Sequence, residues 1–462
     1  MRKPVVVSVA ALLLTCAVPL PTRAAELHPE TWVQRYNGTA NHGDTERDIA
    51  MSPDGALIFV TGGSAETGTH KDITTIVYDA ASGDQVWMRR YDGPDHRRDI
   101  GNALTVSPDG AAVYVTGGSQ SSPRRSANVT LAYDSLTGVA LWVTRLPGGA
   151  YSNGPHTIDI SPNGTTVFVA GITGDRSRHT VVAYDAGSGD ELWLASYRRR
   201  YSGATAVSAS PDGSSVVVTG GTSSAASGHP MVTAAYDAET GEAKWVNRIA
   251  SASAHDLVFG PDASVVYVAG QIGDLDNGDM AVVALDAGTG TKLWQRRYVG
   301  SNERGDWAQA IAVSPDGASV FATGTTQAAP GSWFDYATVA FGSDGTVLWS
   351  RRYDGPSNAY DFGTAIATSP DGARVFVTGT SQDSGVAGDE NDRDWATLAY
   401  DATSGTRLWT ARYDGSADDQ NILHDMAAGL VVSPDGAHVF VGGSSVGITS
   451  GDDYATVAYG TG

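Results

Sequence analysis

Aspartate is the residue type in this chain whose spacing could support chemistry. In five places an aspartate stands eight residues before a Ser-Pro-Asp-Gly sequence: Asp44, Asp99, Asp306, Asp361 and Asp425. Converging carboxylate oxygens can bind a divalent cation such as Ca²⁺, or a polar ligand. An aspartate at the entry to a strand can instead accept backbone hydrogen bonds from a neighbouring turn, which is a structural role. Both interpretations stay open, because the sequence does not show convergence.

Two acidic loops supply further candidate binding residues. The longest interval between repeats, 64 residues, separates Ser369 from Ser433. Its extra residues fall in 381–394 and 416–425, and long loops on a rigid scaffold often carry recognition. A tolerated surface insertion would explain the same loops without a binding role. The candidate binding residues in these loops are Asp383, Asp389, Glu390, Asp392, Asp394, Asp418 and Asp419.

Other catalytic groups are scarce. Cys16 is the only cysteine, so residues 25–462 contain no thiol nucleophile, no cysteine metal site and no disulfide. The ten histidines show no paired metal-ligand spacing, and the serines occupy turns rather than a nucleophile-elbow motif. The formal net charge of −21 opposes binding to nucleic acid or to anionic membranes.

The first 24 residues are typical of a secretory signal. A positively charged start precedes a mostly apolar segment, 5–20, and small residues follow it. The apolar segment is too short to span a bilayer comfortably. We therefore expect residues 1–24 to be removed on export, and residues 25–462 to form a single secreted or otherwise extracytoplasmic domain. Lipidation at Cys16 stays open.

The elements that must position the aspartates repeat along the chain. Ser-Pro-Asp-Gly or a near copy occurs eight times, at intervals of 49 to 64 residues. Each repeat contains four short runs rich in Val, Thr, Tyr and Trp, separated by turn residues, which predicts four strands. The sequence therefore predicts an all-β fold, an eight-bladed β-propeller of four-stranded blades. A second aspartate set opens the predicted third strands, on the same face as the first: Asp72, Asp279, Asp335, Asp394 and Asp453.

One strand is displaced along the chain. The last repeat ends after its third strand, whereas a lone tryptophan strand at 31–36 precedes the first repeat. Every blade has four strands only if 31–36 is the fourth strand of the last blade. This pairing closes the ring and removes exposed sheet edges. We expect the repeated tryptophans to fill the gaps between neighbouring blades. They are Trp32, Trp87, Trp142, Trp193, Trp245, Trp294, Trp349 and Trp409.

The repeats resemble those of a known superfamily. The segments AYDAETGEAKW (235–245) and ALDAGTGTKLW (284–294) resemble the tryptophan-docking motif of eight-bladed quinoprotein propellers, the pyrroloquinoline quinone (PQQ) repeat superfamily. The RYDGP and VFVTGTS sequences also resemble the repeats of secreted bacterial propellers of the SBBP type. The resemblance covers nearly all of residues 25–462 and implies the fold more than a function.

The resemblance implies an activity that the residues only partly match. Quinoprotein dehydrogenases of this superfamily bind PQQ with a divalent cation, usually calcium, beside a disulfide of adjacent cysteines. That disulfide is absent here. The leading hypothesis is therefore a secreted, non-catalytic binding or scaffold protein that takes a protein, glycan or small ligand on its acidic face. The alternatives are a PQQ- and Ca²⁺-dependent dehydrogenase of alcohols or sugars, and a hydrolase or lyase of polysaccharides.

The sequence also predicts what should accompany the fold. We expect no PQQ, and calcium is the one cofactor that stays open. We expect no nucleic-acid partner, no membrane span and a monomer.

Overall fold

The computed structural model of the chain describes residues 26–27, 30–40, 43–68, 70–122, 125–147, 155–173, 178–197, 202–222, 230–273, 278–300, 305–327, 333–357, 359–382, 392–415, 423–447 and 451–462. Within these ranges the chain forms strands and turns and no helix. Consistent with this, no described helix is long and apolar enough to cross a membrane. The predicted secretory signal at 1–24 lies outside the described residues.

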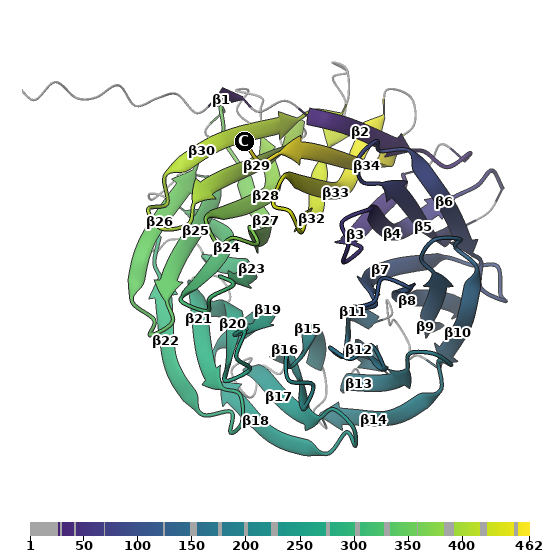
Figure 1. The fold of residues 1–462 in the computed structure, drawn as a ribbon, viewed down its shortest axis with the longest axis horizontal. Coiled ribbons are helices and arrows are strands. Elements are labelled where there is room, and N and C mark those ends of the chain that lie inside the picture. Colours follow the sequence, from purple (N-terminus) through teal and green to yellow (C-terminus); the bar gives the residue numbers. More distant parts are fainter. Residues whose placement is uncertain are drawn as a thin grey trace, which may run out of the picture.

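Eight sheets stand in a closed ring around a central axis (Figure 1). In each blade the first strand lies nearest the axis and the fourth strand lies on the outer rim. The strands of the first four blades are as follows. Blade 1 contains β3 (Thr45–Met51), β4 (Leu57–Ala65), β5 (Lys71–Asp79) and β6 (Gln85–Tyr91). Blade 2 contains β7 (Asp99–Val106), β8 (Ala112–Ser122), β9 (Arg125–Asp134) and β10 (Ala140–Leu146). Blade 3 contains β11 (Pro155–Ile160), β12 (Thr166–Thr173), β13 (Arg178–Asp185) and β14 (Glu191–Tyr197). Blade 4 contains β15 (Ser202–Ala209), β16 (Ser215–Thr222), β17 (Met231–Asp237) and β18 (Ala243–Ile249).

The other four blades complete the ring. Blade 5 contains β19 (Ala252–Phe259), β20 (Val265–Ile272), β21 (Asp279–Asp286) and β22 (Lys292–Tyr298). Blade 6 contains β23 (Trp307–Val313), β24 (Ser319–Gln327), β25 (Phe334–Gly342) and β26 (Val347–Tyr353). Blade 7 contains β27 (Asp361–Thr368), β28 (Arg374–Gln382), β29 (Asp392–Asp401) and β30 (Arg407–Tyr413). Blade 8 contains β32 (Met426–Val432), β33 (His438–Gly447), β34 (Gly451–Gly460) and β2 (Glu30–Tyr36).

The ring closes as the sequence predicted. β2 pairs antiparallel with β34, so that Trp32 lies opposite Ala458 and Tyr36 opposite Tyr454. The N-terminal strand thus supplies the fourth strand of blade 8, and the all-β, eight-bladed propeller is confirmed.

Blade 7 differs from the prediction of four strands, because two short strands join it. β31 (Leu423–His424) pairs parallel with the start of β29, and β1 (Glu26–Leu27) pairs parallel with β30. The pairing between β29 and β30 begins only at Trp395. The first residues of β29 therefore have free backbone groups for β31, and the outer edge of β30 is open to β1.

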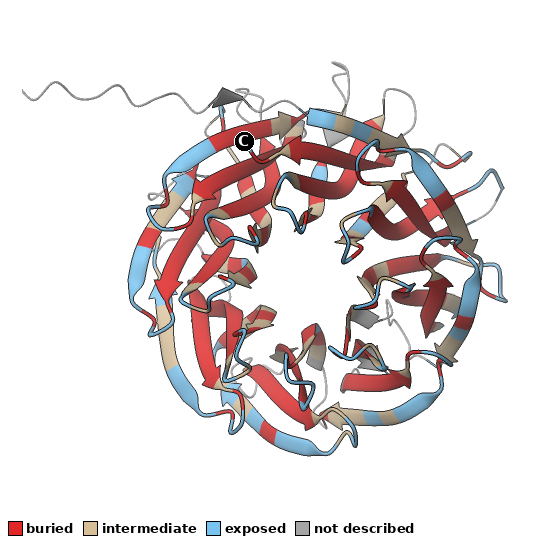
Figure 2. Ribbon diagram, in the orientation of Figure 1, coloured by how far each residue is buried: buried red, intermediate tan, exposed pale blue. Residues whose placement is uncertain are grey.

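The core lies between the blades rather than inside any one of them. In Figure 2 the second and third strands are mostly buried, whereas the outer strands alternate between buried and exposed residues. All nine residues of β4 are buried, because neighbouring blades cover both of its faces. A single blade could not bury these faces alone, so the closed ring is the unit that forms the core.

Each repeated tryptophan connects its blade to the next one. The indole Nε1 donates a hydrogen bond of 2.8 to 3.1 Å to a backbone carbonyl oxygen of the following blade. In seven cases the ring also lies on a glycine with positive φ, so that a Cβ added at Gly83 would lie 2.8 Å from Trp32. The predicted gap-filling role is confirmed. The accepting residues are Ala80, Ser135, Ala186, Ala238, Ala287, Ser343, Ala402 and Thr461.

Candidate functional site

The five aspartates predicted to bind a cation lie at the entries to first strands. Their side chains are only 0 to 3% exposed. In each of them Oδ2 accepts a hydrogen bond from the backbone N–H of the glycine that ends the preceding Arg-Tyr-x-Gly segment. These glycines are Gly38, Gly93, Gly300, Gly355 and Gly415. The aspartates therefore tie each blade connection to the strand that follows it.

The second carboxylate oxygen divides the five aspartates into two groups. In Asp44, Asp306 and Asp425, Oδ1 accepts a hydrogen bond from a backbone N–H near the end of a second strand. The donors are Ala65, Gln327 and Val446, respectively. Oδ1 of Asp99 and of Asp361 is buried and has no hydrogen-bond partner among the described residues. These contacts are those of the structural alternative, and cation binding by the five aspartates stays a prediction.

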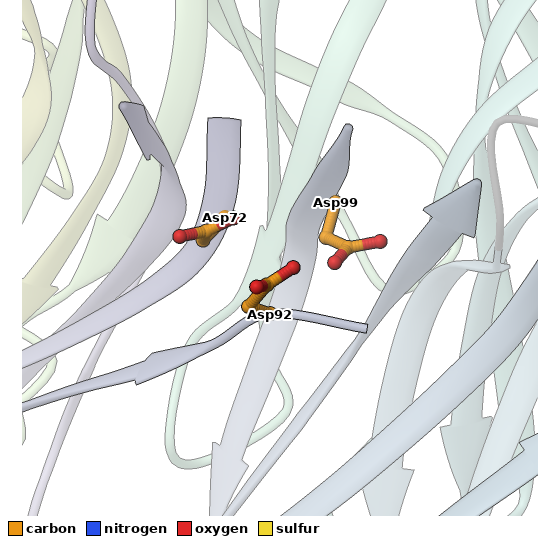
Figure 3. Close-up of side chains that lie close together, drawn as sticks. All are labelled: Asp72, Asp92 and Asp99. Carbon is orange, nitrogen blue, oxygen red and sulfur yellow. The ribbon is translucent and has the colours of Figure 1, made fainter. Parts of the chain in front are cut away.

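Three of the five aspartates join acidic triads at blade junctions. Each triad combines the aspartate of a third strand, the aspartate of an Arg-Tyr-Asp-Gly segment and the aspartate at the entry to the next blade. Figure 3 shows one triad, whose members come from three different segments of the chain. Within each triad one oxygen of every carboxylate lies within 4.8 Å of the others. The triads are Asp72, Asp92 and Asp99; Asp335, Asp354 and Asp361; and Asp394, Asp414 and Asp425.

The triads separate the predicted aspartates rather than gather them. Among the described residues, no such acidic group contains two of the five. Asp44 and Asp306 lack a complete triad, because Asn37 and Val299 occupy the middle position at their junctions. The middle aspartates were not predicted as site residues, since an Arg-Tyr-Asp-Gly segment looks like an ordinary turn.

Burial raises the pKa of several triad aspartates, and like charge adds to the rise in Asp72 and Asp361. Burial raises the pKa of Asp361 to about 7, with repulsion from Asp335 and Asp354 acting in the same direction. Burial likewise raises the pKa of Asp335 to about 6, opposed by the neighbouring Arg352. Burial also raises the pKa of Asp72 to about 6, and repulsion from Asp92 adds to it. A divalent cation at a triad would favour the charged carboxylates and reverse these shifts.

Arginines of the fourth strands already pair with the triads. Arg412 lies 2.7 Å from Asp394, Arg352 lies 2.5 Å from Asp335, and the longer Arg90–Asp72 distance is 3.6 Å. Each triad thus carries partial charge compensation without any ion.

These arginines also connect neighbouring blades. The guanidinium of Arg412 donates to the hydroxyl of Tyr353 in the preceding blade at 3.1 Å, and to Ser381 at 2.8 Å. The repeated arginines and tyrosines are therefore part of the architecture. The same bond joins Arg35 to Tyr413, Arg90 to Tyr36, Arg145 to Tyr91 and Arg248 to Tyr197.

Most of the candidate binding loops lie outside the described residues. Of the loop residues, the structure describes the backbone of Asp392 at the start of β29 and the side chain of Asp394 in its triad. Their predicted role in binding stays a prediction. Asp383, Asp389, Glu390, Asp418 and Asp419 belong to the ranges that the structure does not describe.

The first strands line a central channel with a side chain that changes from blade to blade. The channel holds a cavity of about 530 Å³ among blades 1, 2, 6, 7 and 8, and a second of about 450 Å³ beside blades 4 to 6. Both volumes fall in the range of about 300 to 1,000 Å³ that is usual for ligand sites. The lining residues three positions after the strand-entry aspartates, or after their equivalents Ser202 and Ala252, are Arg47, Asn102, Thr205, His255, Gln309, Thr364 and Ala428.

Most of the chain matches one known protein family. A protein-family profile described as outer membrane protein assembly factor BamB matches residues 32–279 and 278–453, which include strands of all eight blades. The chain belongs to this family. The match also confirms the predicted PQQ-like repeats. No curated protein matches this BamB-family chain.

Solved structures with a similar fold are distant in sequence. Sqt1 from Chaetomium thermophilum, bound to the N-terminus of the ribosomal protein L10, is 14% identical with a TM-score of 0.60, over 92% of this chain and 98% of that chain. The Dos1 propeller is 12% identical with a TM-score of 0.56, over 92% of this chain and 95% of that chain. At such identities the likeness shows a shared fold.

Proposed function

We propose that this BamB-family propeller is an exported, non-catalytic binding scaffold whose ligand enters the central channel. The observation that carries the proposal is the contrast between side chains that repeat and side chains that do not. The repeated Trp, Arg and Tyr side chains bond to a neighbouring blade. The channel position carries Arg, Asn, Thr, His or Gln in different blades, and Ala in blade 8. Selective binding needs a cavity lined by different polar groups that a rigid scaffold holds in place.

Two comparisons support a binding role. The family description names an outer membrane protein assembly factor. One structural neighbour is bound to the N-terminus of another protein. The outer-membrane description and the signal-like residues 1–24 together support export.

The second candidate is the PQQ- and calcium-dependent dehydrogenase, which the PQQ-like repeats favour. The residues present do not fit that cofactor pair. None of the triad aspartates is among the described residues that line the channel cavities, so the triads supply no ligands to a cation inside those cavities. Glu46 is the one acid among the described residues that line the cavity of about 530 Å³. A single carboxylate does not supply the six to eight oxygen ligands that Ca²⁺ takes.

The experiment that tests the scaffold proposal compares channel and rim variants. Residues 25–462 are titrated calorimetrically with a panel of neutral and acidic sugars and short peptides. We expect a ligand from this panel to bind, and Asn102→Ala or Gln309→Ala to weaken it, because both side chains line the cavity. Leu348→Ala on the outer strand of blade 6 is the matched control and should leave binding unchanged. A ligand that binds the wild type and both channel variants with the same affinity would contradict the proposal.

A further inference from the structure

Two arginines from neighbouring blades meet at one side of the channel mouth. Arg47 belongs to the first strand of blade 1, and Arg98 directly precedes the first strand of blade 2. Both side chains are exposed, and both line a cavity of about 170 Å³. Asn102, Gln120 and Ser126 add neutral polar groups to the same cavity.

The two arginines lack a counter-charge, although the chain as a whole is strongly acidic. Neither forms an ion pair within the described ranges, whereas Arg35, Arg352 and Arg412 each pair with an aspartate. A chain with a net charge of −21 has many acids that could have compensated them. The sequence predicts an acidic face, whereas this part of it carries positive charge without an ion-pair partner among the described residues.

A third cation lies close to the pair. The Nζ atom of Lys71 donates a hydrogen bond to Thr45, two residues before Arg47. Desolvation of the covered part of the Arg47 side chain, together with the charge of Arg98, lowers the pKa of Arg47. The same causes lower the pKa of Lys71, opposed by the nearby Asp44 and Asp452. The positive charges therefore repel one another, and a bound anion would relieve that repulsion.

We propose that the cavity between Arg47 and Arg98 binds the oxyanion of a small ligand, a carboxylate or a phosphate. The planar guanidinium group matches both anions through paired N–H···O bonds. A cleft lined by charges of one sign also concentrates oppositely charged ligands. The inference rests on the proposed binding role and names the chemical class of its ligand.

The neighbouring cavity has room for the rest of such a ligand. The cavity of about 530 Å³ shares Arg47 and Asn102 with the small one and is also lined by Phe362 and Met426. A ligand anchored by its anionic end could thus place a sugar-sized body against these apolar side chains. The small cavity alone lies below the usual volume for a whole ligand, roughly 300 Å³.

The test is calorimetry on residues 25–462 at neutral pH and low ionic strength. Inorganic phosphate and galacturonate are the two anionic probes, and galactose is the neutral probe. We expect at least one anion to bind, and its affinity to fall about tenfold or more in Arg47→Gln and in Arg98→Gln. Lys292→Gln removes the same charge from the outer strand of blade 5 and should bind like the wild type. Added salt should weaken binding.

Three results would overturn the inference. They are no binding of either anion, unchanged affinity in both arginine variants, and galactose binding as tightly as galacturonate. The thermal midpoints of the variants check that each one is folded. If both anions fail but another ligand binds and responds to Gln309→Ala, the oxyanion inference falls and the scaffold proposal stands. Catalytic turnover of any ligand would contradict the scaffold proposal, whether or not the two anions bind.

Discussion

Trp349 joins blade 6 to blade 7 through both its ring and its indole N–H. The side chain is 6% exposed, lies between Phe321 and Tyr400, and donates a 2.8 Å hydrogen bond to Ala402. Trp349→Ala should lower the free energy of unfolding by about 3 to 5 kcal/mol, because the cavity and the lost contacts both destabilise. Denaturant unfolding measures this loss.

The neighbouring residue is the control for that loss. Leu348 is 49% exposed on the same strand, so Leu348→Ala should cost about 0.5 kcal/mol or less. Equal losses for the two variants would mean that the tryptophan does not hold the blades together.

A single aspartate can test the triads as cation sites. If Ca²⁺ binds at Asp72, Asp92 and Asp99, it should raise the midpoint of thermal unfolding, because a ligand that binds the folded state stabilises it. Asp92→Asn should reduce that rise. Asp95→Asn changes an exposed acid of the same loop outside the triad, and should keep it. No response to Ca²⁺ in the wild type would mean that the arginines alone compensate these acids.

At the scale of elements, one of the turns that follow the first strands holds a residue in a strained backbone conformation. Most repeats place a glycine with positive φ in this turn, such as Gly317 with φ 71°. Blade 5 places Ala263 there instead, with φ 59°. The left-handed region costs alanine roughly 1 kcal/mol or more. Ala263→Gly should therefore stabilise the protein by about 1 kcal/mol in denaturant unfolding.

The reciprocal change in blade 6 makes the comparison direct. Gly317→Ala should destabilise the protein by about the same amount, about 1 kcal/mol. If both changes lower the free energy of unfolding, packing against the neighbouring turn has a larger effect on stability at this position than backbone strain.

The elements that could be predicted from sequence are those that repeat. Alternating residues and turn signals predicted four strands per blade, and the surplus tryptophan strand at 31–36 predicted how the ring closes. β1 and β31 were missed, because strands of two residues have no periodicity. The triads and the Arg47–Arg98 pair were missed for another reason. Their members come from separate segments of neighbouring blades, and only the register between blades brings them together.

At the scale of the whole molecule, closure of the ring is the first test. Removing residues 1–37 deletes β1 and β2 and exposes the edge of β34. The shortened chain should unfold at a lower temperature and aggregate, because an open sheet edge pairs with other chains. Removing residues 1–29 keeps β2 and is the control, which should remain folded and elute as the intact protein does. Equal behaviour in size-exclusion chromatography would contradict closure by β2.

Stability should also depend on pH, with a maximum at about pH 4. Burial raises the pKa of Asp48, Asp159 and Asp256 to about 6, and that of Asp361 to about 7. Aspartate in an unfolded chain has a pKa of about 3.9. The stability linked to these groups is therefore complete below about pH 4 and is lost as the pH rises through 6 and 7.

The exposed turn aspartates act in the opposite direction. Hydrogen bonds from the turn serines lower the pKa of residues such as Asp54, so their contribution is lost as the pH falls through that lowered value. Thermal midpoints measured across the pH range should thus rise from about pH 7 to about pH 4 and fall again in stronger acid. A midpoint that rises steadily up to pH 8 would contradict the raised pKa values.

The central claim is that repeated residues build the ring while the channel binds a ligand without transforming it. The most direct measurement is a titration of residues 25–462 with PQQ and Ca²⁺, followed by a dye-linked assay of electron transfer from alcohols and sugars. We expect no dye reduction that depends on PQQ. Saturable PQQ binding together with Ca²⁺-dependent turnover would contradict the central claim and make the protein a quinoprotein dehydrogenase.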